Sequence, residues 1–420
     1  MEQHGSQLVK EKFNYLNKFK ILNFLLLSIP FLLPIEKTTV RFLMAIFTVA
    51  CLIYGDYSQL KIKKNWIKLS IVSLWVLPFI QLLLLNRIDE YLNNLITKIT
   101  LFLIPILILI GYQSNKINLS GILKFFVYGT VSSCLFCLIN AVISYYFLKN
   151  DNAFTYTYLS LFHHPTYFTM YLNFVVGIIY LNNLKPIKNF KLPTNLSLII
   201  ISFLSFFILF ASSRIGWISN ILIHLFFTSF MLYNKKFSRK AIIYFLVLII
   251  PFLTFIYTNK TIQYRFNEII TYTFQKMDRK KVQSSTSARK IIWSTSFKLI
   301  KEKWITGYGT GLSKKVLQEQ YKKDGYDYMY KKNYNSHNQY LQVFLDQGIF
   351  GFLLLVFFTF GMLYLSLKQY DFIYALFLVI MILNFMTESI LEIQSGVIFF
   401  AFFNSIFFFQ WFNKKYLVLE

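Results

Sequence analysis

The chain has 420 residues, of which 56% are hydrophobic and only 15% are charged, and its mean hydropathy is +0.51. This balance excludes an ordinary soluble domain and predicts a protein that crosses a membrane many times. The formal net charge is +25, but many basic residues lie in short connections between apolar runs, which is typical of membrane topology rather than of nucleic-acid binding. We therefore expect a lipid bilayer as a partner and no nucleic acid.

The apolar runs predict an all-α polytopic membrane protein with about twelve transmembrane helices, because a helix needs about 20 apolar residues to cross roughly 30 Å of hydrocarbon. The predicted spans lie near residues 20–36, 39–54, 66–86, 95–112, 119–147, 166–183, 194–212, 215–233, 240–258, 343–367, 371–388 and 395–413. Basic residues mark alternate connections, among them Lys61, Lys63 and Lys64, then Lys185, Lys188 and Lys191, then Lys235, Lys236 and Arg239. By the positive-inside rule, these connections and both termini are cytoplasmic.

The predicted spans divide the chain into transmembrane helices one to nine in residues 1–258, an outer loop in residues 259–339, and helices ten to twelve in residues 340–420. The first run follows a basic N-terminus and shows no small-residue cleavage site, so we expect an uncleaved signal anchor. By parity the long loop faces outward. It holds 17 Lys and Arg against 6 Asp and Glu, and such a surface beside a membrane favours anionic headgroups or an anionic lipid-linked substrate.

Within this loop the spacing predicts an amphipathic helix from Ala288 to Trp304, with Ser287 as its N-cap. Its apolar residues repeat at helical spacing, and they are Trp293, Phe297, Ile300 and Trp304. Such a helix can lie on the bilayer surface or line a cleft. Three alternating glycines, at positions 307, 309 and 311, then favour a chain reversal over a phosphate-binding turn.

His337 is a candidate general base because it lies where the hydrophilic loop meets the tenth span. Ser336 followed by Gln339 fits a capping box, which predicts His337 in the first turn of a helix. The positive end of that helix favours a neutral imidazole, which can accept a proton from an attacking hydroxyl. The alternative is an ordinary surface or interfacial histidine.

Two arginines are predicted on the same outer side as His337. Arg214 follows Ser212 and Ser213 in a tight turn between the seventh and eighth spans, and Arg289 opens the helix of the outer loop. Guanidinium groups match diphosphate oxygens bidentately, so these two could bind a pyrophosphate leaving group without a metal. The alternative for an arginine at a helix end is contact with lipid headgroups.

The remaining titratable residues carry weaker signals. His163 and His164 lie at the outer end of the sixth span without metal-ligand spacing, so a substrate contact is the functional alternative to a structural one. Glu388 and Glu392 could orient a base or pair with an arginine, although solvated loop carboxylates are commoner. The cysteines, Cys51, Cys134 and Cys137, all fall inside apolar runs. We expect no disulfide, no metal and no cofactor.

Several motifs taken together resemble the signature region of the O-antigen ligase and O-antigen polymerase superfamily. They are Ser213-Arg214, Arg289 to Trp293, Gly307-Tyr308-Gly309-Thr310-Gly311, and His337-Asn338-Gln339-Tyr340-Leu341-Gln342 with Gly348 and Gly351. One position departs from the family pattern, since Asp346 stands where the family more often has Glu.

The resemblance implies an enzyme of the bacterial inner membrane whose active site faces the periplasm. It would move a glycan from undecaprenyl pyrophosphate to an acceptor hydroxyl, with inversion and without a metal. His337 would activate the acceptor, Arg214 and Arg289 would contact the pyrophosphate, and the supporting residues would be Asn338, Tyr340, His164 and Glu388.

The acceptor stays open between lipid A core, as in an O-antigen ligase of lipopolysaccharide biosynthesis, a growing polysaccharide, as in a polymerase, and a protein hydroxyl, as in an O-oligosaccharyltransferase. A lipid-linked glycan transporter is the alternative from another class. A transporter would be expected to carry charged or helix-breaking residues near mid-membrane. Pro78, Pro105 and Pro251 lie inside predicted spans and could break helices in this way. The candidate residues instead collect at the outer edge, which favours an enzyme.

Overall fold

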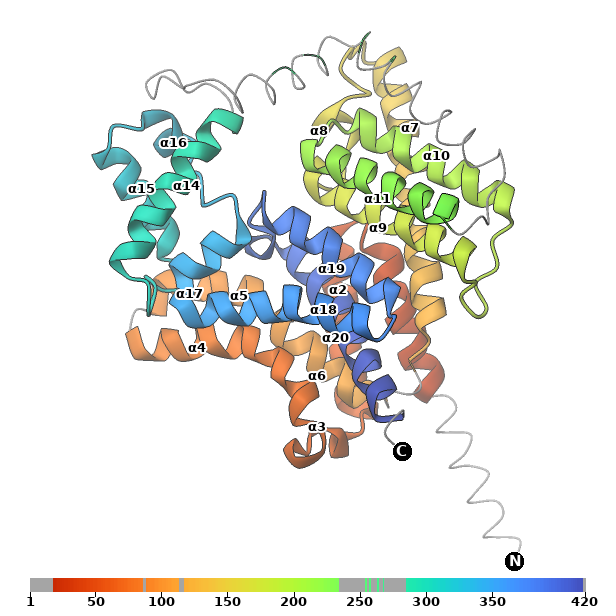
Figure 1. Ribbon diagram of the computed structural model, residues 1–420, viewed down its shortest axis with the longest axis horizontal. Coiled ribbons are helices and arrows are strands. Elements are labelled where there is room, and N and C mark those ends of the chain that lie inside the picture. The colour runs from red at the N-terminus through yellow and green to blue at the C-terminus, as the bar shows by residue number, and fades with distance from the viewer. Residues whose placement is uncertain are drawn as a thin grey trace, which may run out of the picture.

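The computed structural model describes residues 18–85, 88–112, 117–233 and 285–417, with isolated positions 254, 257, 263 and 267. Every regular element in these ranges is a helix (Figure 1). The first helix covers residues 18–32. The others are α2 Lys37–Tyr54, η1 Tyr57–Leu60, α3 Ile62–Leu69, η2 Ser70–Val72, α4 Ser73–Leu85, α5 Ile88–Lys98, α6 Thr100–Gly111, α7 Leu119–Tyr146, α8 Tyr156–Leu159, α9 Pro165–Leu184, α10 Thr194–Phe210, α11 Arg214–Tyr233, α14 Ser285–Glu302, α15 Ser313–Lys323, α16 Asp327–Lys331, α17 Gln339–Val356, η4 Phe357–Gly361, α18 Met362–Lys368, α19 Phe372–Phe385, η5 Ile390–Glu392 and α20 Gln394–Leu417.

Among the described residues, seven helical stretches are long and apolar enough to cross a membrane. They are Lys37–Tyr54, Asn65–Leu84, Leu92–Gly111, Leu119–Tyr146, Arg214–Tyr233, Gln339–Lys368 and Gln394–Asn413. Each corresponds to a predicted span, so the all-helical, multi-pass prediction is confirmed. Two further predicted spans appear as the shorter apolar helices α10 and α19. The span expected at 240–258 lies outside the described residues, and the total of twelve stays a prediction.

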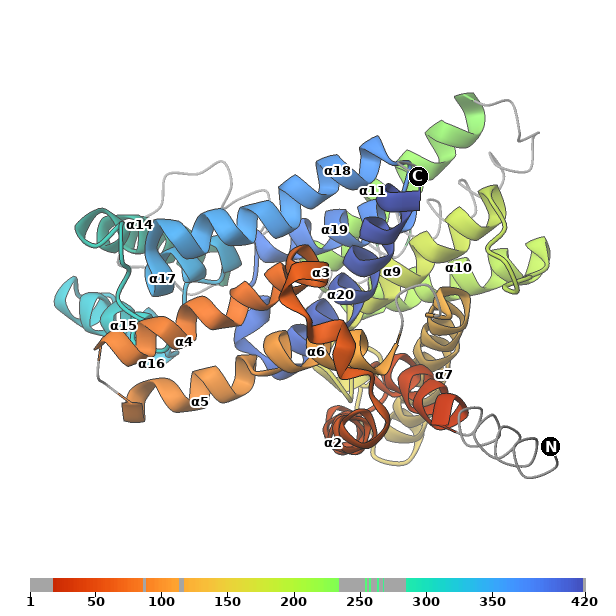
Figure 2. The same ribbon diagram turned by 90° about the horizontal axis from the view of Figure 1, so that it is seen from below.

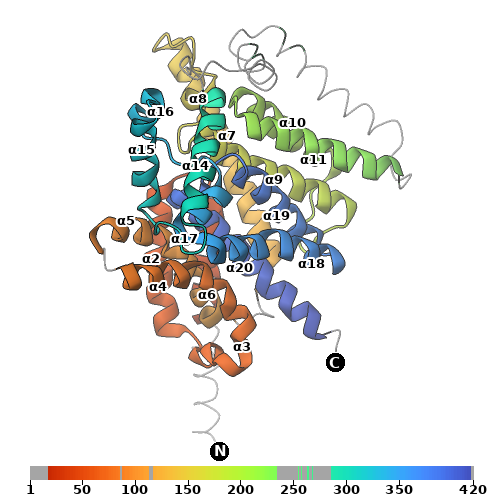
Figure 3. The ribbon, with the colours of Figure 1, turned by 60° about the vertical axis from the view of Figure 1, so that its left-hand side comes forward.

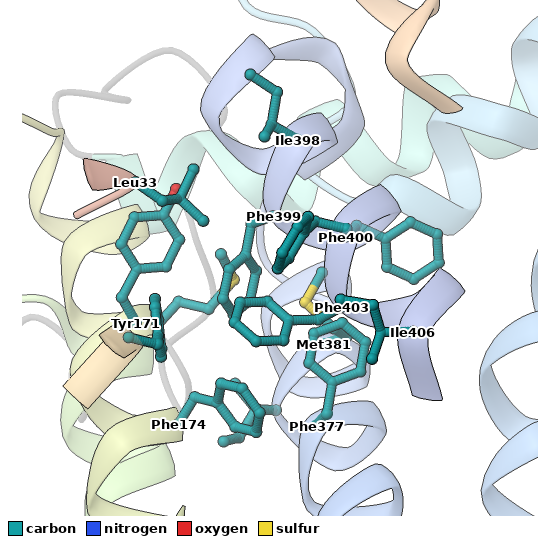
Figure 4. Packing of buried hydrophobic residues seen from close by; sticks show 14 of the residues in the cluster. Leu33, Tyr171, Phe174, Phe377, Met381, Ile398, Phe399, Phe400, Phe403 and Ile406 are labelled. Carbon is teal, nitrogen blue, oxygen red and sulfur yellow. The ribbon is translucent and has the colours of Figure 1, made fainter. Parts of the chain in front are cut away.

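The transmembrane core is built around α20, in which 89% of the membrane-crossing stretch is buried. Phe399 and Phe403 of this helix pack in tilted and edge-to-face arrangements against Phe377 of α19 and against Phe174 and Tyr171 of α9 (Figure 4). Ring pairs of this kind add about 0.5–1.5 kcal/mol each beyond their buried area. The richness in phenylalanine is therefore used partly inside the protein, where it fixes α9 and α19 against α20.

Helices α14, α15 and α16 form an outer body that stands on α17 (Figures 1 and 3). Its small core includes Ile292 and Leu299 of α14, Tyr321 of α15, and Leu341 and Leu345 of α17. Helix α14 thus packs against protein through its apolar face, and α4 runs along the neighbouring side of α17, with α5 packed against α4 (Figure 2).

The amphipathic helix expected from Ala288 to Trp304 is present as α14, but two of its predicted details were wrong. The helix runs from Ser285 to Glu302, so Ser287 lies inside it instead of capping it. The stripe predicted for its apolar face is also rotated, because Phe297 and Trp304 are more than half exposed while Ile291 and Ile292 are buried.

A turn of glycines after α14 attaches the outer body to α17 through backbone hydrogen bonds. Gly307, Gly309 and Gly311 all have positive φ, which confirms the chain reversal. The amides of Tyr308 and Gly309 donate to the carbonyls of Leu345 and Asp346 at 2.7 and 2.8 Å. These carbonyls are available because Gly348, with φ +65° and ψ −157°, interrupts the ladder of α17.

Replacing Gly348 by alanine should strongly destabilise the protein. A Cβ at this position would lie 2.1 Å from the carbonyl oxygen of Ile305, and the backbone conformation alone costs a residue with a side chain about 1–3 kcal/mol. Gly361→Ala is the matched control, since its Cβ would meet only the side chain of Phe357. Thermal unfolding in detergent should show a large loss for Gly348→Ala alone, and equal midpoints for both variants would contradict this account.

Candidate functional site

His337 lies just before α17, in a strained left-handed conformation. Its φ is +44°, and its amide donates to Oδ1 of Asn335 at 3.0 Å. The N-cap of α17 is Asn338, whose Oδ1 accepts from the amide of Leu341 at 3.1 Å. The predicted capping box was therefore wrong, because Ser336 instead contacts the carbonyl of Asn338 and the side chain of Gln342. His337 stands outside the helix, where its ring is held by other groups.

The carboxylate of Glu388, in the connection between α19 and η5, joins His337 to Arg289. Its Oε2 lies 3.0 Å from Nδ1 of His337, and its Oε1 lies 3.0 Å from Nη2 of Arg289. The exposed fractions are 17% for Glu388, 24% for Arg289 and 25% for His337. Residues from α14, from the start of α17 and from the end of α19 thus meet at a partly open position.

Glu388 is ionised in this arrangement, and its ionisation determines which ring nitrogen of His337 carries a proton. Burial opposes ionisation, but the hydrogen bond and charge of His337, with the charge of Arg289, hold the pKa of Glu388 below its usual value. An ionised carboxylate only accepts hydrogen bonds, so Nδ1 of His337 carries the proton. Nε2 is then left as an acceptor when the ring is neutral.

The groups next to His337 restrict its ring further. Tyr334 meets the imidazole edge-on with ring centroids 5.0 Å apart, and Nδ2 of Asn338 donates to the carbonyl of Met386 at 3.0 Å, which ties α17 to the Glu388 connection. Asn338 therefore supports the site by position. Tyr340 is buried with its hydroxyl on Oγ1 of Thr359, so the structure places it in the core between α17 and η4.

The adjacent histidines of the sixth span have separate environments. His163 is buried, and its Nε2 donates to the carbonyl of Leu33 at 3.0 Å. Burial lowers the pKa of His163 to about 4, so it is neutral near pH 7. His164 caps α9, accepting from the amide of Thr166, and its Nε2 lies 3.1 Å from the hydroxyl of Tyr156. The charge of His164 also acts on Glu388, which associates it with the site.

Arg214 begins α11, and the contacts between α9 and α11 place it at the same end of the bundle as His164. Helices α9 and α11 run parallel, because Gly216 lies against Thr169 and Asn220 donates to Asn173 at 3.1 Å. Arg214 is therefore level with the first turn of α9, which His164 caps. The contacts of Glu388 join Arg289 and His337, whereas Arg214 belongs to the neighbouring helix end.

Three aspects of the site went beyond the sequence prediction. Glu388 and Glu392 are largely buried and each has a basic partner, so the expectation of solvated carboxylates was wrong. Tyr334 and Tyr156 were not singled out, although Tyr334 lies three residues before His337 in a polar stretch. His163 is buried whereas the adjacent His164 is exposed, and nothing in the sequence indicated this difference.

A family model described as O-antigen ligase matches residues 198–356. Over this part of the chain the sequence is similar to the O-antigen ligase family. The match confirms the resemblance, and it covers Arg214, Arg289 and His337 while ending before Glu388. It supports a function of the ligase or polymerase type for this chain. No curated protein matches the chain significantly.

His163 should make stability depend on pH. The unfolded chain binds a proton at His163 near pH 6.5, whereas the folded protein does so only near pH 4. Because the unfolded state binds more protons between these values, stability should fall as the pH falls from about 6.5 toward 4. Thermal unfolding of His163→Gln should show a shallower loss between pH 7.5 and 5 than the parent protein. His164→Gln is the adjacent control, and an unchanged slope in His163→Gln would contradict the assignment.

Proposed function

We propose that this protein is a glycosyltransferase of the O-antigen ligase type. It transfers a glycan from undecaprenyl pyrophosphate to an acceptor hydroxyl at the periplasmic face of a bacterial inner membrane. The observation that carries the proposal is the bridge by which Glu388 joins His337 to Arg289. A base and a cation that are held on one carboxylate suit a reaction in which a hydroxyl is deprotonated while an anionic group departs.

His337 acts as the general base through Nε2. The acceptor oxygen attacks the anomeric carbon and forms the new glycosidic bond, and its proton moves to Nε2. The carbon–oxygen bond to the pyrophosphate breaks on the opposite face, so the configuration inverts and the electron pair leaves with the phosphate. Glu388 stabilises the imidazolium that forms, in the way that a carboxylate supports the histidine of a catalytic triad.

Arg289 receives the charge of the departing pyrophosphate. A guanidinium carries several N–H donors in one plane, and the contact with Glu388 uses the donor at Nη2. The remaining donors can bind phosphate oxygens bidentately, and Arg214 at the end of α11 adds a second cation. These cations stabilise the negative charge that develops on the pyrophosphate in the transition state, which lowers the activation barrier.

The outer body favours an anionic glycolipid acceptor. Exposed lysines lie on and around α14, α15 and α16, and they are Lys301, Lys303, Lys314, Lys315, Lys322, Lys323, Lys331 and Lys332. A phosphorylated acceptor such as lipid A core would be attracted to this surface. This charge favours the ligase over the polymerase and the protein O-oligosaccharyltransferase, which would use the same donor and the same base.

The proposal predicts that single changes at the bridge abolish transfer. Purified protein in nanodiscs would be incubated with undecaprenyl-pyrophosphate-linked glycan extracted from the source cells and with lipid A core, a glycan or a protein as acceptor. Mass spectrometry would detect the product. His337→Ala should slow transfer by about 100- to 10,000-fold, and Arg289→Ala by roughly 100-fold, equivalent to about 3 kcal/mol.

Arg41→Ala, which removes an exposed arginine on α2, is the matched control and should retain the parent rate. Full transfer by His337→Ala at normal expression would contradict the assignment of the base. Products with a glycan or protein acceptor but none with lipid A core would replace the ligase by one of the alternatives.

A further inference from the structure

The buried ammonium group of Lys98 connects α5 to two segments next to the candidate site, the connection that carries Glu388 and helix α17. Lys98, the last residue of α5, is only 3% exposed. Its Nζ lies 2.5 Å from Oε1 of Glu392 and 3.5 Å from Oδ2 of Asp346. Glu392 follows Glu388 by four residues, and Asp346 lies in α17, which begins just after His337. Burying an ammonium group is costly unless carboxylates compensate it, so both contacts hold Lys98 in place.

Side chains of α5 contact both carboxylate oxygens of Glu392. While Lys98 holds Oε1, Nδ2 of Asn94 donates to Oε2 at 3.0 Å. Asn94 and Lys98 are one helical turn apart, so they present their side chains on one face of α5. Glu392 is 11% exposed and cannot turn away without breaking both contacts. The C-terminal end of the connection that carries Glu388 is therefore fixed to α5.

A second set of polar contacts connects Lys98, through Asp346 and other residues in or beside α17, to the connection that carries Glu388. It accepts from Oγ of Ser313 and from Nε2 of Gln342. The other end of the Gln342 amide, Oε1, accepts from Oγ of Ser336 at 2.9 Å. Ser336 in turn lies 3.2 Å from Oγ of Ser389, which is next to Glu388. A continuous chain of polar contacts, starting with the Lys98–Asp346 ion pair, thus runs from Lys98 to the neighbour of the bridging carboxylate.

Backbone contacts hold the connection on either side of Glu388. The carbonyl of Met386 accepts from Asn338 at 3.0 Å, and the amide of Leu391 donates to Oε1 of Gln339 at 2.6 Å. Glu388 lies between these two attachments. The direction of its carboxylate therefore depends on where residues 386–392 are held, and Lys98 is the cation that holds their far end.

We propose that Lys98 is a positioning residue for transfer, and that it acts through Glu392 to keep Glu388 between Arg289 and His337. This inference rests on the proposed function for its catalytic consequence. Without the ammonium group, Asp346 and Glu392 would face each other as unneutralised carboxylates. Their repulsion would move Glu392 toward solvent, carry η5 with it and loosen the Glu388 bridge.

A kinetic test uses Lys98→Met in the nanodisc transfer assay, with the lipid-linked glycan extract as donor. The turnover rate should fall at least about 10-fold with little change in the KM for donor, because Arg289 and Arg214 remain. In a Glu388→Gln background, Lys98→Met should cause no further loss, since Lys98 acts through Glu388. Lys98→Arg and the double variant Lys98→Met with Glu392→Gln should recover part of the rate, because the first keeps the cation and the second removes one repelling carboxylate.

Lys68→Met is the matched control, because Lys68 is also a buried lysine but stacks on Phe412 away from Glu388. It should keep the parent turnover. If Lys98→Met does not fold, Glu392→Gln keeps the Lys98–Asp346 pair and should show the same selective loss of turnover. Parent turnover in the Lys98 variant, or in Glu392→Gln as its substitute, would overturn the inference. So would a loss that multiplies with that of Glu388→Gln.

Hydrogen exchange of the intact protein separates this inference from the proposed function, since it needs no substrate. Amides of residues 386–392 should exchange faster in Lys98→Met, or in Glu392→Gln if the former does not fold, than in the parent or Lys68→Met. Parent-like protection would overturn the inference even if transfer is confirmed. Absence of transfer by the parent protein, together with faster exchange in the variant, would overturn the proposed function while supporting the role of Lys98 in holding Glu388.

Discussion

The candidate site depends on one carboxylate that is shared by two cationic or potentially cationic groups. Glu388 lies 3.0 Å from both Arg289 and His337, and these three residues come from segments that the sequence keeps far apart. Removing the carboxylate would leave a partly buried guanidinium without its counter-charge and free the imidazole to rotate or change tautomer. The geometry of the base and the charge of the arginine are thus set by the same contact, which makes the site sensitive to the position of one short connection.

Two different kinds of packing hold that connection. On one side, phenylalanines of α20 fix α19 and α9 in the transmembrane core. On the other, a break in α17 at Gly348 frees carbonyls that anchor the glycine turn after α14, so Arg289 is carried on a body attached to the same helix that follows His337. Buried polar contacts then join the two halves. The candidate site therefore lies where the apolar helical bundle meets the polar outer body.

Much of this could be predicted from the sequence, and the failures have physical causes. Run length and charge alternation predicted the helices because a bilayer imposes both, whereas α10 and α19 came out shorter than a full span. His337, Arg289 and Glu388 were candidates from residue type and position. Their pairing was not predictable, because contacts across 51 and 99 positions depend on tertiary packing. The capping box failed locally, since the adjacent Asn338 competes for the same helix start and takes it.

The central claim is that Glu388 holds His337 with Nδ1 protonated and Nε2 available to the acceptor. Nitrogen-15 NMR of the histidine-labelled protein at neutral pH, assigned by comparison with His337→Gln, measures this tautomer directly. The account predicts that the neutral form of His337 carries its proton on Nδ1 in the parent protein, and that the ratio of tautomers changes in Glu388→Gln. A parent His337 protonated on Nε2, or a ratio that does not respond to Glu388→Gln, would contradict it.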